Sequence, residues 1–435
     1  MVEIRAFKGI VYNWENMDAV DPVLAPPYDV INPDQQEALY QKSPINVVRL
    51  ILGKQFAEDN DQNNRYTRSA ADLAQWMEQG TLKPFPLSAL YVYSQEYDIE
   101  GARLNRIGFI CRLKLEEYGK GQVFPHERTL SGPKTDRLNL TRACRMNFSQ
   151  IFGLYEDPQL ALDKLLEEQM KKAPPAVEAE QDGVIHRMWP VSDPDFIAKA
   201  QSFMADKDMV IADGHHRYET ALNYRNERRQ QEGGAAGEYD CALVFLSNTH
   251  GQGFTVLPTH RFVLKSDISA DEALKTLASD FEISDMLQVS QEEAAGFMAR
   301  LKEAGKEAVA YGMYTGKGAM RLLKLKKDAP LPNPPGSDRI DMLRKLDVTI
   351  LQELILTKAL DITREKVEAG GHIYYTIHAA DAMKKVDEGT AKIAFLMNPT
   401  GIDQVMDIAR GGGTMPQKST YFYPKLISGL VFNPL

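Results

Sequence analysis

The sequence predicts a mixed α/β fold. Short apolar runs such as 242–246 and 393–397 are typical of buried strands, and they alternate with helix-like segments such as 65–78, which stops at Gly80. The chain has 435 residues, of which 43% are hydrophobic, so it can bury a large core. We therefore expect two or three packed lobes built on an α/β core.

Residues 1–265 are expected to form the first lobe, a catalytic core. Two strands at 90–97 and 107–113 flank a turn that contains Gly101, a pattern typical of a β-hairpin. The apolar runs 209–212 and 242–246 predict buried strands. Helices are predicted at 34–40, 65–78, 158–172 and 196–204.

Two further segments are expected after this lobe. Residues 266–327 predict a small α/β lobe, with helices at 270–280 and 291–304 and strands at 308–314 and 320–325. Residues 328–435 predict a proline-rich linker followed by a C-terminal α/β segment that packs back on the core. In that segment we expect a helix at 348–359, capped by Asp347, and a strand at 393–397.

Composition excludes several classes of protein. The net charge of -9 argues against a sequence-independent nucleic-acid binder, which needs a basic face. The N-terminus carries charges where a signal peptide would be apolar, and no apolar run reaches membrane-spanning length. We expect a cytoplasmic protein without nucleic-acid or membrane partners. Cys111, Cys144 and Cys241 form no paired metal motif and are expected to be reduced core thiols.

The segment 209–222 is the best candidate for an active site. An apolar run ends at Ala212 just before Asp213, Gly214 allows a positive φ, and a helix-like stretch follows His215, His216 and Arg217. The start of a helix attracts anions, and these three side chains offer donors to phosphate oxygens. The turn therefore predicts a phosphate cradle without a Walker loop.

Two other interpretations of this turn stay open. Asp213 would cap the helix by accepting a backbone N–H, leaving His215 and His216 as surface turn residues. A zinc site is the other interpretation. It is less favoured, because adjacent histidines on a turn diverge, whereas metal-binding helices space them about four apart.

The turn and its helix resemble the signature of the ParB and sulfiredoxin-like superfamily, in particular its free serine kinase branch. The whole chain is similar to the bacterial domain-of-unknown-function family 1015, the HHR family, through segments 25–31, 125–129, 257–261 and 415–422. This resemblance implies a ParB/sulfiredoxin-like core, a turn that acts on nucleotide phosphates, and a link to serine and phosphoserine metabolism. It does not imply DNA binding, because the chain is acidic.

A second chemical cluster lies at 125–137. His126 or Glu127 would take the proton of a hydroxyl substrate, while Arg128 and Lys134 would offset phosphoryl charge. The zinc-protease motif is absent, because Leu130 occupies the place of its second histidine. The alternative is a solvated charged loop.

Three more groups complete the candidate site. Each offers hydroxyl, amine or carboxylate groups that suit phosphate or substrate binding. The alternatives are surface ion pairs for 259–261, a mobile loop for 418–420 and an Asx-type turn for 28–29. Phosphate-binding residues are predicted at Thr259, His260, Arg261, Lys418, Ser419 and Thr420, and substrate-binding residues at Tyr28 and Asp29.

These features predict a phosphate-handling enzyme of serine metabolism. Glu127, His126, Asp213 and His216 are the expected catalytic residues, and Asp213 would also bind Mg²⁺ that bridges the phosphates of ATP or ADP. The substrate would be serine or phosphoserine, with the direction and a homo-oligomeric state left open. The alternatives are a nucleotide-operated (CTP or ATP) switch without turnover and a metal-dependent hydrolase that uses His215 and His216.

Overall fold

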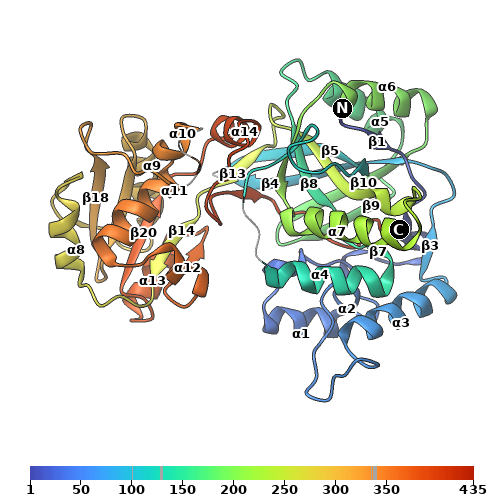
Figure 1. Ribbon diagram of the computed structural model, residues 1–435, viewed down its shortest axis with the longest axis horizontal. Coiled ribbons are helices and arrows are strands. Elements are labelled where there is room, and N and C mark those ends of the chain that lie inside the picture. Colours follow the sequence, from blue (N-terminus) through green and yellow to red (C-terminus); the bar gives the residue numbers. More distant parts are fainter. Residues whose placement is uncertain (100, 128–130, 335, 337–339) are drawn as a thin grey trace. The chain divides into compact units, whose positions relative to one another are not determined.

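The computed structural model describes residues 1–99, 101–127, 131–334, 336 and 340–435, and it has the mixed α/β fold that the sequence predicts (Figure 1). The chain divides into two compact units. Unit 1 comprises Met1–Pro125, Thr129–Thr255 and Pro424–Leu435, and unit 2 comprises His126–Arg128 and Val256–Tyr423. The predicted segments 266–327 and 328–435 both contribute strands to one sheet of unit 2, while the last residues belong to unit 1.

Unit 1 is built on a mixed sheet that has nine strands within the described residues. The strand order is β6-β11-β8-β12-β5-β4-β10-β9, and β1 pairs with β5. The predicted hairpin is confirmed, because β4 and β5 pair antiparallel from Tyr91↔Ile110 to Ile99↔Ala102. The strands are β1 (Ile4–Arg5), β4 (Leu90–Ile99), β5 (Ala102–Lys114), β6 (Val123–Pro125), β8 (Ile151–Tyr155), β9 (Val177–Gln181), β10 (Val184–Val191), β11 (Met209–Asp213) and β12 (Cys241–Asn248). Two short pairs flank it: β2 (Ile10–Tyr12) with β3 (Leu82–Pro84), and β7 (Met146–Asn147) with β22 (Asn433–Pro434).

The helices predicted at 34–40, 65–78, 158–172 and 196–204 form in unit 1, whereas α2 and the long helix α4 were not predicted. α3 begins after Asn64, whose side chain accepts from the N–H groups of Tyr66 and Thr67, and it ends before Gly80. In Figure 1, α5 and α6 lie against each other near the N-terminal strand β1. The helices are α1 (Pro33–Lys42), α2 (Val48–Ile51), α3 (Arg65–Glu78), α4 (Ser131–Cys144), α5 (Ala161–Lys172), α6 (Pro194–Ala205) and α7 (His215–Gln231), with 3-10 turns η1 (Trp14–Asn16), η2 (Asp21–Val23), η3 (Tyr28–Val30) and η4 (Glu238–Asp240).

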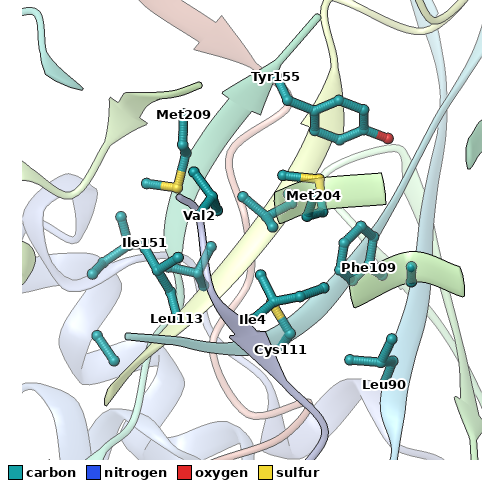
Figure 2. Close-up of a cluster of buried hydrophobic side chains, with 14 of the residues drawn as sticks. Val2, Ile4, Leu90, Phe109, Cys111, Leu113, Ile151, Tyr155, Met204 and Met209 are labelled. Atoms are coloured by element: carbon teal, nitrogen blue, oxygen red, sulfur yellow. The ribbon is translucent and has the colours of Figure 1, made fainter. Parts of the chain in front are cut away.

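One face of this sheet holds an apolar core that anchors β11. Alternate residues of the central strands point into it and meet side chains of α5, α6 and α7. Figure 2 shows Met209 of β11, Ile151 of β8 and Cys111 of β5 in this cluster. Cys111, Cys144 and Cys241 are all buried free thiols, as predicted, and burial raises the pKa of the Cys111 thiol.

Unit 2 is built on an antiparallel sheet with seven strands among the residues described. Its order is β15-β18-β17-β20-β14-β19, and β16 pairs with β18. The strands are β14 (His260–Val263), β15 (Phe281–Ile283), β16 (Leu287–Gln288), β17 (Ala310–Tyr314), β18 (Ala319–Leu325), β19 (Ile373–Thr376) and β20 (Ile393–Met397), and β13 (Thr255–Leu257) pairs with β21 (Tyr421–Tyr423). The helices are α8 (Ala270–Leu277), α9 (Ala294–Gly305), α10 (Met342–Lys345), α11 (Asp347–Ile350), η5 (Leu351–Ala359), α12 (Arg364–Ala369), α13 (Ala379–Asp387) and α14 (Ile402–Arg410).

The helix predicted at 348–359 differs from the prediction in two respects. Only its first turn, α11, is α-helical, and η5 is a π-helix. The predicted cap was wrong, because Asp347 is the first helical residue and Leu346 occupies the N-cap position without a side-chain cap. Burial instead raises the pKa of Asp347 to about 7.

In the part of the chain that the structure describes, no helix combines the length and apolarity needed to cross a lipid bilayer.

Candidate functional site

The predicted strand, turn and helix at 209–222 are confirmed. β11 ends at Asp213, Gly214 adopts a φ of 90°, and α7 begins at His215. The register of β11 against β8 shifts between Ile211 and Asp213, as at a β-bulge, and places Asp213 opposite Phe152. The Tyr218 N–H donates to Gly214 O over 3.0 Å, which closes the first helical turn.

Gly214 is required at this position for two reasons. Its φ lies in the left-handed region, and a Cβ there would lie 2.8 Å from Arg217 Nε and 2.9 Å from Arg217 Cζ. The bare glycine therefore lets the guanidinium of Arg217 lie directly over the turn.

We expect Gly214→Ala to lower the free energy of unfolding by about 1–2 kcal/mol, because of the left-handed backbone. It should also displace the Arg217 side chain and weaken phosphate binding. The matched control is Gly80→Ala, since Gly80 has a φ of 70° and no atom within 4 Å of the added Cβ. Urea unfolding and phosphate titration of both variants check this. Equal phosphate affinity in the two variants would contradict the role given to Gly214.

Asp213 lies between two cations. Its Oδ2 accepts from Arg217 Nη2 over 2.6 Å, and its Oδ1 accepts from Lys425 Nζ over 2.9 Å. Burial alone would raise the pKa of Asp213, but the charges of Lys425 and Arg217 hold it well below the ordinary value. Asp213 is therefore ionised and orients both cations. The N-cap residue of α7 is Gly214, which has no side chain to cap the helix, and both Asp213 oxygens accept from cations instead.

A third cation, Arg106, was missed by the sequence analysis. Its side chain is buried and donates to the neutral oxygens of Gln95 and Pro424, and its guanidinium lies 4.7 Å from the Phe152 ring centroid. Burial lowers its pKa to about 10, and Tyr97, Tyr93 and Asp213 act in the opposite direction. Arg106 stays protonated and adds positive charge near the turn.

We name the group formed by Arg106, Asp213, Gly214, Arg217 and Lys425 the cation turn. Arg217 also donates to the carbonyl of Gln150, which fixes its guanidinium. The group combines three cations with the Asp213 carboxylate and with the positive end of the α7 dipole. Such a group favours an anion as an additional ligand.

The donor set of the turn does not fit a magnesium ion. Both oxygens of Asp213 are hydrogen-bonded to cations, whereas Mg²⁺ needs carboxylate oxygens free to coordinate it. Within the described ranges, no group of three or more His, Cys, Asp and Glu side chains is arranged to hold a metal ion. The turn is therefore suited to an anion. If the ligand is a nucleotide, the N–H donors of the cation turn fit its phosphate groups.

Of the other predicted residues of unit 1, Lys134 and Tyr28 have structural partners. Lys134 Nζ donates to Glu219 over 2.8 Å, and Asp29 is exposed in η3. The Arg137 guanidinium lies 3.9 Å from the Tyr28 ring centroid. Tyr28, Arg137 and Arg217 line one cavity in this unit. The sequence predicts Tyr28 as substrate-binding, and in the structure its side chain lines this cavity.

The remaining predicted clusters meet in unit 2. His126 Nε2 is 3.0 Å from Thr420 Oγ1, and Glu127 forms a β-bridge with Met415. Arg261 Nη2 donates to the carbonyl of Lys418 over 3.1 Å. Three motifs that are distant in the sequence, at 126–127, 259–261 and 415–420, thus lie together in unit 2. Arg128, predicted to bind phosphate, lies outside the described residues.

The predicted residues are therefore divided between the units. Those in unit 1 are Tyr28, Asp29, Lys134, Asp213, Gly214, His215, His216 and Arg217. Those in unit 2 are His126, Glu127, Thr259, His260, Arg261, Lys418, Ser419 and Thr420.

Comparisons with solved structures give distant likenesses. A free serine kinase in complex with AMP is 13% identical, with 69% of this chain and 83% of that chain covered and a TM-score of 0.33. A conserved hypothetical protein from Pyrococcus furiosus is 14% identical, with 71% and 91% covered and a TM-score of 0.32. SbnI from Staphylococcus aureus, truncated at its C-terminus, is 10% identical, with 71% and 83% covered and a TM-score of 0.34.

No curated protein matches the sequence. A family model does match, over residues 4–349, which is most of the chain. The protein belongs to the family described as "Protein of unknown function (DUF1015)".

Proposed function

We propose that this protein is a phosphate-handling enzyme that binds the phosphate group of its substrate at the cation turn. The observation that carries the proposal is the placement of Asp213 between Arg217 and Lys425, at the start of α7. One carboxylate offsets only one of these two charges, and the α7 dipole and Arg106 add further positive potential. A bound phosphate would neutralise the positive charge that Asp213 leaves.

Asp213 gives the site its geometry before a ligand arrives. The carboxylate and the Gln150 carbonyl hold the Arg217 guanidinium in one orientation, so less conformational entropy is lost on binding. The Arg217 side chain is 12% exposed and the Lys425 side chain 18% exposed, so both are accessible to a ligand. Charge-assisted hydrogen bonds in such partly buried sites are stronger than bonds between neutral groups.

The substrate we propose is a small hydroxyl compound of the serine type, with ATP or ADP as phosphoryl donor. The resemblance of the Asp213–Arg217 turn to the free serine kinase branch supplies this substrate class. In the forward direction the serine hydroxyl oxygen bonds to the terminal phosphorus, the bond from that phosphorus to the bridging oxygen breaks, and a base takes the hydroxyl proton. The reverse direction returns phosphoserine to serine and transfers the phosphoryl group to ADP, AMP or water. Glu127 as the base stays a prediction.

Phosphorus NMR of the purified protein tests the proposal. ATP or ADP is supplied with serine, and phosphoserine is supplied with or without AMP or ADP, each with and without magnesium. We expect phosphoryl transfer in one of these mixtures, loss of turnover in Arg217→Ala and Glu127→Gln, and retention in Arg142→Ala. Arg142 is the matched control, because its side chain is 49% exposed and pairs with Glu227 at the surface.

The outcomes separate the candidate functions. Tight nucleotide binding without turnover would support a nucleotide-operated switch instead. Absence of both turnover and binding of any phosphate compound would contradict the proposal.

A further inference from the structure

Unit 2 contains a buried arginine whose charge is not neutralised by any described residue. Arg261 lies on β14, which pairs with β19 on one side and β20 on the other, and the residue is only 4% exposed. Its guanidinium donates to the carbonyls of Thr259 and Lys418 and contacts Met397 Sδ. Each of these partners is neutral.

No carboxylate pairs with Arg261 among the residues that the structure describes. Burial lowers the pKa of Arg261, and the groups that counter this effect are the phenols of Tyr375 and Tyr311. A buried charge is costly unless an opposite charge and hydrogen bonds compensate it. This guanidinium therefore lacks a counterion among the residues that the structure describes.

A neighbouring hydroxyl is also without a partner. Thr259 is 5% exposed, and its Oγ1 makes no hydrogen bond to any described atom. Arg261 Nη1 donates to the backbone carbonyl of the same residue over 2.5 Å, so the orphan hydroxyl and the unneutralised cation are close together. Most buried side-chain polar atoms are hydrogen-bonded, so a missing partner of Thr259 requires an explanation.

We infer that Thr259 and Arg261 form an oxyanion site in unit 2, made of other residues than the cation turn. Arg261 has N–H groups left on Nε and Nη2 after its bonds to the protein, and this edge of a guanidinium matches two oxygens of a phosphate or carboxylate group. The Thr259 hydroxyl donates to the same anion. The segment Gln417–Thr420 borders the site, since Lys418 supplies a carbonyl to Arg261. This inference does not depend on the proposed function.

The chemistry specifies an oxyanion, and its source is either a phosphate or a carboxylate. Isothermal titration at constant ionic strength distinguishes them, with inorganic phosphate in one arm and acetate in the other. We expect the wild-type protein to bind phosphate at two sites, Arg217→Ala to keep the unit 2 site, and Arg261→Met to keep the cation turn. Affinity at the unit 2 site should fall about tenfold or more in Arg261→Met. A site that prefers acetate would identify the ligand group as a carboxylate.

The matched control is Arg364→Met, because Arg364 belongs to the same unit but has a carboxylate partner, Glu353 Oε1, at 2.7 Å. Phosphate binding should be unchanged in that variant. Arg261→Met should also raise the thermal midpoint in buffer without phosphate, since an unneutralised buried charge is removed.

A second variant keeps the inference testable if Arg261→Met does not fold. Thr259→Val removes only the orphan hydroxyl, and in an Arg217→Ala background it should weaken the remaining phosphate site about threefold or more. Two results would overturn the inference: a folded Arg261→Met protein with wild-type phosphate binding at both sites, or a Thr259→Val protein with unchanged affinity at the remaining site. If only phosphate binding at the cation turn were absent, that result would instead contradict the proposed function.

Discussion

Replacing Arg217 with alanine is expected to weaken nucleotide binding by about 2–3 kcal/mol, which is about 30- to 150-fold. In the proposed function Arg217 supplies a charge-assisted donor to phosphate. Its side chain is held by Asp213 and by the Gln150 carbonyl. Truncation removes this donor and leaves Asp213 with Lys425 as its main cation. The Asp213 carboxylate then repels an incoming phosphate more strongly than before. Fluorescence or calorimetric titration with ATP and ADP measures the effect.

Two further variants define what Arg217 contributes. Arg217→Lys keeps the charge but loses the planar fork, so its affinity should lie between those of the wild type and Arg217→Ala. Arg142→Ala on α4 removes an ion pair with Glu227 and a hydrogen bond to Asn139, both exposed, and should bind nucleotide as the wild type does. Unchanged affinity in a folded Arg217→Ala protein would show that phosphate does not bind at the cation turn.

Unit 1 is expected to lose stability steadily as the pH falls below about 6.5. His186 is buried, and its Nδ1 is 2.6 Å from Tyr93 Oη. Burial and the charge of Arg106 lower its pKa to about 3. The unfolded chain takes up a proton below about 6.5, whereas the folded protein does not until about pH 3. The stability contribution is complete above the unfolded pKa and falls by about 1.4 kcal/mol per pH unit below it.

Tryptophan fluorescence can follow this loss in unit 1 alone, because Trp14, Trp76 and Trp189 all belong to that unit. Urea unfolding between pH 7 and pH 4.5 should give a falling free energy in the wild type and a shallower slope in His186→Gln. The control is His250→Gln, which changes an exposed histidine of the same unit. Equal slopes in wild type and His186→Gln would show that His186 is not the group responsible. Ionised Asp213 acts in the same direction, but only below its unfolded pKa of about 3.9.

Local chemistry was enough to predict the strand, turn and helix of the cation turn. The apolar run at 209–212, the glycine that permits a positive φ, and the unbroken segment after it each depend on neighbouring residues only. The same holds for the hairpin of β4 and β5 and for α3, whose ends are set by Asn64 and Gly80.

The partners of the turn could not be predicted in this way. Lys425 follows Asp213 by 212 residues in the sequence, whereas Arg106 precedes Asp213 and lies within β5. Lys425 and Arg106 lie close to Asp213 because of the strand order and because residues 424–435 belong to unit 1. The hydrophobic periodicity of the sequence predicts neither feature. Likewise, the sequence indicated that Thr259 and Arg261 suit an anion. It did not indicate that Arg261 is buried without an acid among the described residues.

The measurement that tests the cation turn most directly is nitrogen-15 NMR of the protein labelled only on histidine. The chain has eight histidines, and the amides of His215 and His216 lie in the first turn of α7. Addition of ATP or inorganic phosphate should shift these two signals, and the shifts should be lost in Arg217→Ala. Signals of His215 and His216 that stay in place while ATP binds elsewhere would contradict a phosphate site at this turn.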